Sequence, residues 1–99
     1  MPLDIAGQGR ARVPDHVVQR DFQDETVVLN LETGQYHGLN PTARRMLAAL
    51  IEFDSIALAA TALEAELGMP RAHIERDLID VCDALVARGL LDFDDAQAA

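Results

Sequence analysis

The sequence predicts an α+β fold in which a three-stranded antiparallel sheet is followed by three helices. In residues 26–31 the apolar Val27, Leu29 and Leu31 alternate with a second set, Thr26, Val28 and Asn30, the period of two that is typical of a half-buried strand. After residue 40 the apolar residues instead recur at helical spacing, in three stretches separated by a short break and by Gly68. The 99 residues, 49% of them apolar, are enough for one domain with a modest aliphatic core.

The first two strands are predicted at residues 16–22 and 26–31, with a polar turn between them. In the second strand we expect Val27, Leu29 and Leu31 to face the core, because alternate residues share one face of a strand. Leu29 is therefore a predicted core residue.

The third strand is predicted at residues 35–39, after a turn that contains Gly34. Glycine tolerates the positive φ that a hairpin turn or a bulge requires. The sequence leaves the register open. A two-residue turn places Leu31 opposite Tyr36, whereas a bulge at Gly34 shifts the pairing by one residue.

Capping residues mark where the first two helices begin and end. Asn40 before Pro41 is a favourable N-cap for the first helix, in which Leu47 belongs to the apolar stripe. Ser55 is placed to cap the second helix, and Gly68 is placed to end it.

The third helix is predicted at residues 71–88 and ends at Gly89. Its apolar surface is wider than one packing contact usually needs. The main stripe contains Ile74, Leu78, Val81, Cys82 and Leu85, and a second line contains Ile79, Cys82 and Val86. We expect residues 1–12 to form a flexible arm, residues 13–92 the folded domain and residues 93–99 an acidic tail.

The charge balance narrows the choice of partners. The formal net charge is −9, with seventeen acids, eight arginines and no lysine, which argues against nucleic acid and against an anionic membrane surface. Cys82 is the one cysteine, and the sequence shows neither a secretory signal nor an apolar run long enough to span a membrane. We therefore expect a cytoplasmic protein without an internal disulfide.

Motifs for phosphate binding, dinucleotide binding, zinc proteolysis and serine hydrolysis are absent from the sequence. His16, His37, His73 and Cys82 are scattered, with no two at ligand spacing on one helix face, so we expect neither a metal nor a cofactor. An interaction surface remains. If the third strand lies at an edge of the sheet, its free backbone groups can accept an extended peptide as a fourth strand.

Several short segments together resemble the PqqD family of precursor-peptide recognition elements, which serve pathways to ribosomally made peptide natural products. The segments are residues 28–31, 33–36, 39–43 and 74–78, Leu85, and residues 89–91. The Tyr-x-x-Leu-Asn segment that leads into the first helix is the most specific of them. The leader-binding proteins of lasso-peptide clusters are the most similar members, although Met46 stands where many members carry Trp.

The resemblance implies no catalysis, and the binding of a leader peptide as an added antiparallel strand in a groove walled by the third helix. On the strand side it points to Gln35, Tyr36, His37, Gly38 and Leu39. On the helix side we expect the residues of the second apolar line, together with the neighbouring Leu78, to contact the peptide. These residues are Leu78, Ile79, Cys82 and Val86. Plain core packing explains these helix residues about as well.

We thus expect an adaptor that presents the leader of a precursor peptide to a maturation enzyme, either a leader peptidase or a radical SAM enzyme. One alternative is a winged-helix transcriptional regulator, because the last two helices resemble a helix-turn-helix. Three arginines against four acids on the third helix fit phosphate contact poorly. The other alternative is a structural subunit that forms a homodimer through the same strand edge.

Overall fold

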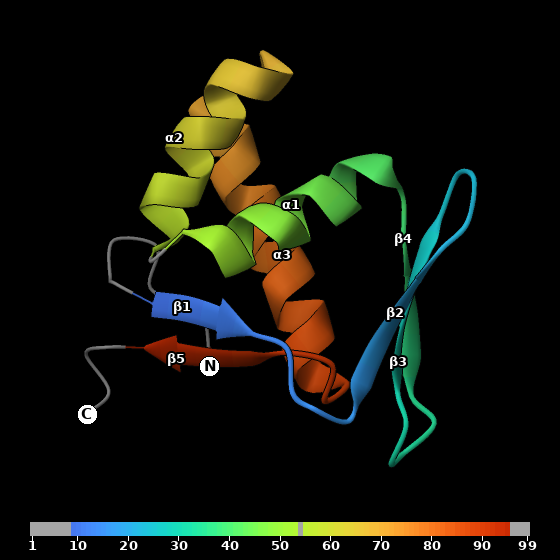
Figure 1. Cartoon of the computed structure of the whole chain (residues 1–99). Coiled ribbons are helices and arrows are strands. Elements are labelled where there is room, and N and C mark those ends of the chain that lie inside the picture. The colour runs from blue at the N-terminus through green and yellow to red at the C-terminus, as the bar shows by residue number, and fades with distance from the viewer. Residues whose placement is uncertain (1–8, 54, 96–99) are drawn as a thin grey trace.

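The computed structural model describes residues 9–53 and 55–95 and shows a small sheet beside three helices (Figure 1). The sheet contains β2 (Val17–Asp21), β3 (Thr26–Asn30) and β4 (Tyr36–Leu39), and the helices are α1 (Pro41–Glu52), α2 (Ile56–Leu67) and α3 (Arg71–Ala87). Two further strands, β1 (Gly9–Arg12) and β5 (Asp92–Asp95), pair with each other. The predicted α+β fold, a three-stranded sheet followed by three helices, is confirmed.

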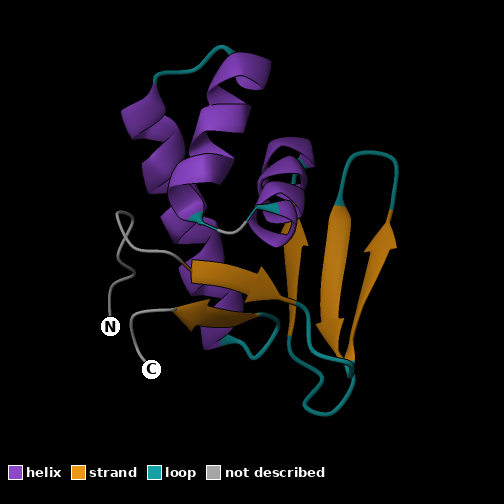
Figure 2. Cartoon of the chain, turned by 60° about the vertical axis from the view of Figure 1, so that its left-hand side comes forward, coloured by secondary structure: helices purple, strands orange, loops and turns teal. Residues whose placement is uncertain are grey.

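Strands β2, β3 and β4 form an antiparallel meander in that order, so β2 and β4 are its two edges. Figure 2 shows the three strands side by side, with the helices gathered to one side of them. Val28 from β3 and Leu39 from β4 point into the core and are each only 2% exposed.

Strand β3 has the predicted period of two but the opposite phase. Thr26, Val28 and Asn30 are buried, whereas Leu29 is half-buried and Leu31 is 61% exposed. The prediction that Leu29 belongs to the core is therefore wrong. Two polar residues can occupy inward positions because their side chains are hydrogen-bonded, as when the Thr26 hydroxyl donates to a β2 carboxylate over 2.8 Å.

The β3–β4 hairpin takes neither register considered from the sequence. Leu29 lies opposite Tyr36. A two-residue turn would instead have placed Leu31, two residues later, opposite this tyrosine. Asn30 holds the wider turn, because its side-chain oxygen accepts hydrogen bonds from two turn N–H groups at 2.8 and 3.1 Å. Gly34, with φ 79°, closes the turn by donating its N–H to the Asn30 carbonyl over 2.8 Å.

The predicted N-caps of α1 and α2 are confirmed. The side-chain oxygen of Asn40 accepts a hydrogen bond from the Ala43 N–H at 2.7 Å, with Pro41 at the first helical position. The Ser55 hydroxyl accepts one from the Leu58 N–H at 3.0 Å. Each cap satisfies one of the N–H groups that a helix start leaves without a partner inside the helix.

The helix ends are confirmed as well. Gly68 and Gly89 follow α2 and α3 with φ of 66° and 69°. Beyond Gly89, the Leu90 N–H donates to the Leu85 carbonyl over 2.9 Å, and Leu90 and Leu91 fold back into the core. Other large core side chains are those of Met46, Leu47, Leu50, Ile56, Leu63, Ile74 and Leu78.

Strands β1 and β5 form an antiparallel ribbon that the sequence did not predict. Residues 9–12 fall in the expected arm and residues 93–95 in the expected tail, and the rest of both segments lies outside the described residues. Ala11 is buried opposite Phe93, which packs against the core. Pairing between the two ends of a chain leaves no local pattern in a sequence.

Candidate functional site

The open edge of β4 is the first component of the site, because among the described residues β3 is the one strand that pairs with β4. The Asn30 N–H donates to the Gln35 carbonyl over 2.8 Å, which fixes the alternation of hydrogen bonds along the hairpin. His37 therefore bonds toward β3, while the N–H and C=O groups of Tyr36 and Gly38 point outward. An extended chain alongside β4 would find donors and acceptors at alternate residues.

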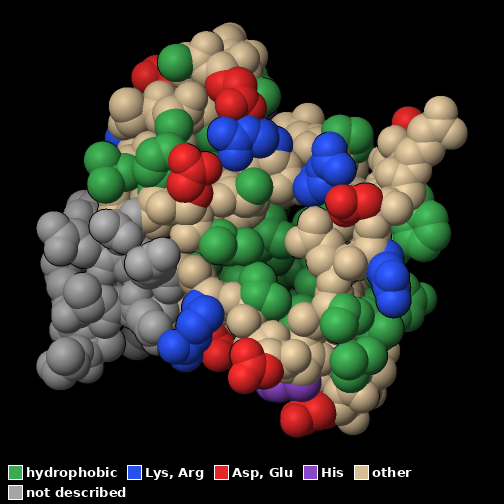
Figure 3. Space-filling model, viewed as in Figure 1, with side chains coloured by type: hydrophobic (Ala, Val, Ile, Leu, Met, Phe, Trp, Pro, Cys, Tyr) green, Lys and Arg blue, Asp and Glu red, His purple; other side chains and the backbone are tan. Residues whose placement is uncertain are grey.

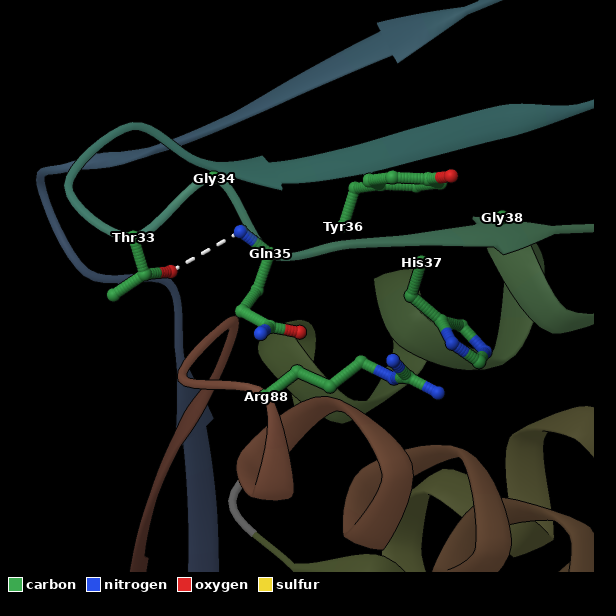
Figure 4. Close-up of a pocket in the computed structure, with 7 residues that line it drawn as sticks. All are labelled: Thr33, Gly34, Gln35, Tyr36, His37, Gly38 and Arg88. Atoms are coloured by element: carbon green, nitrogen blue, oxygen red, sulfur yellow. Dashed lines mark hydrogen bonds between the residues drawn. The ribbon is translucent and has the colours of Figure 1, made fainter.

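A pocket of about 490 Å³ lies along this edge (Figure 4). Its lining consists of Thr33, Gly34, Gln35, Tyr36, His37, Gly38 and Arg88. Figure 4 shows the Gln35 and His37 side chains on the side of β4 that faces Arg88, with the Tyr36 ring on the other side. The pocket thus joins the start of β4 to the C-terminal end of α3.

A second pocket, of about 210 Å³, lies where β4 passes into α1. Its lining consists of Asn40, Thr42, Ala43, Met46, Asp77, Asp80 and Val81. Asp77, Val81 and Arg88 lie on one face of α3 by their spacing, and this helix runs in the opposite direction to β4 (Figure 1). We call the open edge of β4 together with Asp77, Asp80, Val81 and Arg88 the β4 groove.

The two ends of the β4 groove carry opposite charges. Arg88 stands at the start of β4, and no other described residue forms an ion pair with it. Asp80, beyond the end of β4, is likewise without an ion pair among the described residues. Its neighbour Asp77 lies 3.1 Å from His73 Nε2 on the exposed side of the helix.

Four of the five strand residues predicted from the sequence line the pocket of about 490 Å³ along β4. Gln35, Tyr36, His37 and Gly38 all line it, and the backbone groups of Tyr36 and Gly38 are the outward ones. Leu39 does not line it, because its side chain is buried in the core.

The helix residues predicted from the sequence lie elsewhere. Leu78 and Cys82 are 0% exposed, so core packing explains both and neither lines a pocket of the groove. Ile79 lines a third pocket, shared with Arg76 and with Asp80, which thus stands between this pocket and the groove. Val86 is 41% exposed but lines neither pocket of the groove.

Sequence reasoning missed the residues that do form the helical wall. Val81 was assigned to the main core stripe, from which it is displaced just enough to remain half-buried beside the second pocket. Arg88 lies seven residues, or about two turns, beyond Val81. This spacing was the available signal, but a charged residue at a helix end is ordinary and gave no reason to select it.

Burial raises the pKa of the Cys82 thiol to about 12, and the nearby charge of Asp83 adds to the rise. At neutral pH this cysteine is therefore protonated and unsuited to act as a nucleophile. Within residues 9–53 and 55–95 no group of His, Cys, Asp and Glu side chains is arranged to hold a metal ion. Within the same residues no helix has the length and apolar character needed to cross a membrane.

The other edge of the sheet borders a hollow of about 520 Å³ between α1 and β2. Leu47, Ala48 and Ile51 supply apolar lining, and an ion pair of 3.7 Å joins Arg44 to Asp21 beside it. Figure 3 shows apolar side chains at the base of a hollow and charged side chains around it. Strand β2 is also unpaired on this side, so an experiment must tell the two edges apart.

The family model described as coenzyme PQQ synthesis protein D (PqqD) matches residues 25–91, well over half of the chain. The chain belongs to the PqqD family. The region matched to PqqD contains β3, β4 and all three helices, and therefore both walls of the β4 groove. None of the curated proteins matches the sequence.

Two solved structures are similar to this PqqD-family chain. TbiB1 in complex with the TbiA(beta) leader peptide is 36% identical, with coverage of 82% of this chain and 94% of that one, and a TM-score of 0.70. A lasso peptide synthetase B1 complexed with the leader peptide is 25% identical, with coverage of 84% and 98% and a TM-score of 0.74. The resemblance to leader-binding proteins of lasso-peptide clusters is confirmed, and nothing in these comparisons supports a transcriptional regulator or a structural subunit.

Proposed function

We propose that the chain is a non-catalytic adaptor that binds the leader of a ribosomally made precursor peptide as an added antiparallel strand along β4. The observation that carries the proposal is the open edge, with the backbone groups of Tyr36 and Gly38 pointing outward beside the α3 wall. The likeness to two proteins solved with leader peptides supports it.

Strand addition divides the work of recognition between backbone and side chains. The main-chain hydrogen bonds supply affinity that depends little on the sequence of the peptide. Side chains of the peptide that turn toward α3 meet Val81 and Arg88, whereas those that turn away lie beside the Tyr36 ring. The helical wall therefore supplies the selectivity.

The adaptor acts by bringing the precursor peptide close to the maturation enzyme. A protein that holds the leader and also contacts a maturation enzyme makes their encounter intramolecular, which raises the effective concentration to about the millimolar range. We propose a leader peptidase as that enzyme, because one of the two similar structures is a lasso peptide synthetase B1, with a radical SAM enzyme as the alternative. The buried, protonated Cys82 supports a role without catalysis by the adaptor itself.

Proline substitutions test the edge directly, since proline removes one N–H while an edge strand can survive it. Tyr36→Pro removes an outward N–H and should weaken binding of the TbiA(beta) leader peptide about tenfold or more, with the fold retained. Tyr36→Ala keeps the N–H and controls for loss of the ring. His37→Pro removes an N–H that β3 needs and should unfold the hairpin. Calorimetric titration measures affinity, and circular dichroism reports the fold.

Gln19→Pro is the matched control at the other edge. The Leu31 N–H donates to the His16 carbonyl over 2.8 Å, so by alternation the N–H of Gln19 points away from β3. We expect Gln19→Pro to bind the peptide as the wild type does. Unchanged binding by a folded Tyr36→Pro variant would refute strand addition on β4, and loss of binding with Gln19→Pro would move the site to β2.

A further inference from the structure

The charges of the β4 groove are arranged along the direction in which a bound strand would run. Arg88 stands beside the start of β4, and Asp80 lies beyond its end. A strand added antiparallel to β4 runs the other way, so its C-terminal part lies near Arg88 and its N-terminal part near Asp80. The charges therefore distinguish the two ends of a peptide.

Strand addition alone leaves the register of the peptide undetermined. Backbone groups repeat every two residues, so a slip of two residues keeps every main-chain hydrogen bond and presents the same face. A charged contact at each end of the groove removes this ambiguity, because a slip separates both pairs at once.

Resting on the proposed strand addition, we propose that the groove selects a leader segment with a basic side chain near its N-terminal end and an acidic side chain near its C-terminal end. Asp80 and Arg88 are eight residues apart on α3, about 12 Å along the helix axis. An extended strand covers this length in about four residues. The acidic residue should therefore follow the basic residue by about four positions.

Arg88 also has an ordinary structural role, since a cation at the C-terminal end of a helix is favourable. Two observations indicate that it does more than this. Its side chain extends along the groove beneath Gln35 and His37, and no acidic side chain among the described residues pairs with it (Figure 4). In a chain of net charge −9, an arginine left without such a pair is available for an acid supplied from outside.

A charge scan tests the proposal. Each position of the TbiA(beta) leader peptide is replaced in turn by Glu and by Lys, and every peptide is titrated against the wild type, Arg88→Glu and Asp80→Lys. We expect one position at which Glu strengthens binding to the wild type about three- to fivefold, with the preference reversed by Arg88→Glu. The position at which Lys couples to Asp80 should lie about four residues before it. The couplings should weaken as salt is raised.

Arg76→Glu is the matched control for Arg88→Glu, because it makes the same charge change on α3 and Arg76 lines neither pocket of the β4 groove. If no peptide position couples to Arg88 more strongly than to Arg76, or if the acid-preferring position precedes the base-preferring one, the proposal is refuted. Tyr36→Pro then tells the failure of charge selection from the failure of strand addition. If this variant loses binding while no charge coupling is found, strand addition along β4 is supported and only the charge selection is refuted. A wild-type protein that binds neither this peptide nor the leader of the lasso peptide synthetase B1 complex would overturn both.

Discussion

Asn30 links three parts of the fold, and its truncation gives the sharpest stability prediction. The side chain is buried, with its residue 3% exposed. Its oxygen accepts hydrogen bonds from the Glu32 and Thr33 N–H groups at 2.8 and 3.1 Å, and its nitrogen donates to the Gly89 carbonyl over 3.0 Å. One residue of β3 therefore holds both the turn that begins β4 and the end of α3, where Arg88 lies.

Asn30→Ala should destabilise the protein by about 2–4 kcal/mol. The Glu32 and Thr33 N–H groups belong to an exposed turn where water can replace the lost partner, so each contributes about 0.5–1 kcal/mol. The Gly89 carbonyl lies between the sheet and the helix end, and loss of its partner adds about 1–2 kcal/mol. The assay is urea unfolding followed by circular dichroism. The free energies of unfolding of variant and wild type are compared with the same slope of free energy against urea concentration.

Thr33→Ala is the control for this experiment. It deletes a single hydrogen bond, in which the Thr33 hydroxyl accepts from the exposed Gln35 N–H at 3.1 Å, and it should cost under about 1 kcal/mol. If Asn30→Ala is no more costly than Thr33→Ala, the three contacts of Asn30 do not hold the hairpin to α3. Gly89→Ala offers a second check, because its φ is 69° and an added Cβ would meet the Asn30 nitrogen at 3.1 Å.

Three further predictions concern the core, the thiol and acid stability. Leu47→Ala should cost about 2–5 kcal/mol and Leu29→Ala, on the half-buried face, about 1 kcal/mol; equal urea midpoints would contradict the phase of β3. Cys82, with a pKa of about 12, should resist iodoacetamide at about pH 8 until the protein unfolds, and prompt labelling of the native protein would mean that α3 opens readily. Hydrogen bonds, chiefly from the Thr26 hydroxyl, lower the pKa of Asp21 below its ordinary 3.8. The ionised carboxylate therefore stabilises the fold at pH values above 3.8, and this stabilisation is lost as the pH falls through the lowered pKa. Asp21→Asn should therefore lower the Tm at about pH 7 by more than at about pH 3, and an equal loss at both would refute the linkage.

Local signals in the sequence predicted most of the fold. Capping side chains and left-handed glycines act within a few residues of themselves, which is why Asn40, Ser55, Gly68 and Gly89 marked the helix ends correctly. The phase of β3 could not be read in the same way. Asn30 is polar, yet it faces inward because its partner, the Gly89 carbonyl, comes from the far end of α3. A contact so distant in the chain is invisible to a pattern of alternating residues.

The sequence pointed to the strand side of the candidate site more directly than to the helix side. The strand edge follows from the order of the strands, and the sequence indicated that order through its turns. The helical wall depends on how α3 is rotated about its axis, and two apolar lines fitted the sequence almost equally. Packing assigned Leu78 and Cys82 to the core, and it left Arg88 facing β4 and Val81 beside the start of α1.

The β1–β5 ribbon has a consequence for how this fold can be rewired. Gly9 lies opposite Asp95 in the ribbon, so the outer ends of both strands lie next to each other, on the side of the molecule away from β4 (Figure 1). A domain tethered to either strand would depart from the same place and leave the groove open. A short loop joining the two strands would likewise allow a circular permutant, with new ends cut at an exposed turn such as that between β2 and β3. The open edge of β4 is in this sense independent of where the chain is opened.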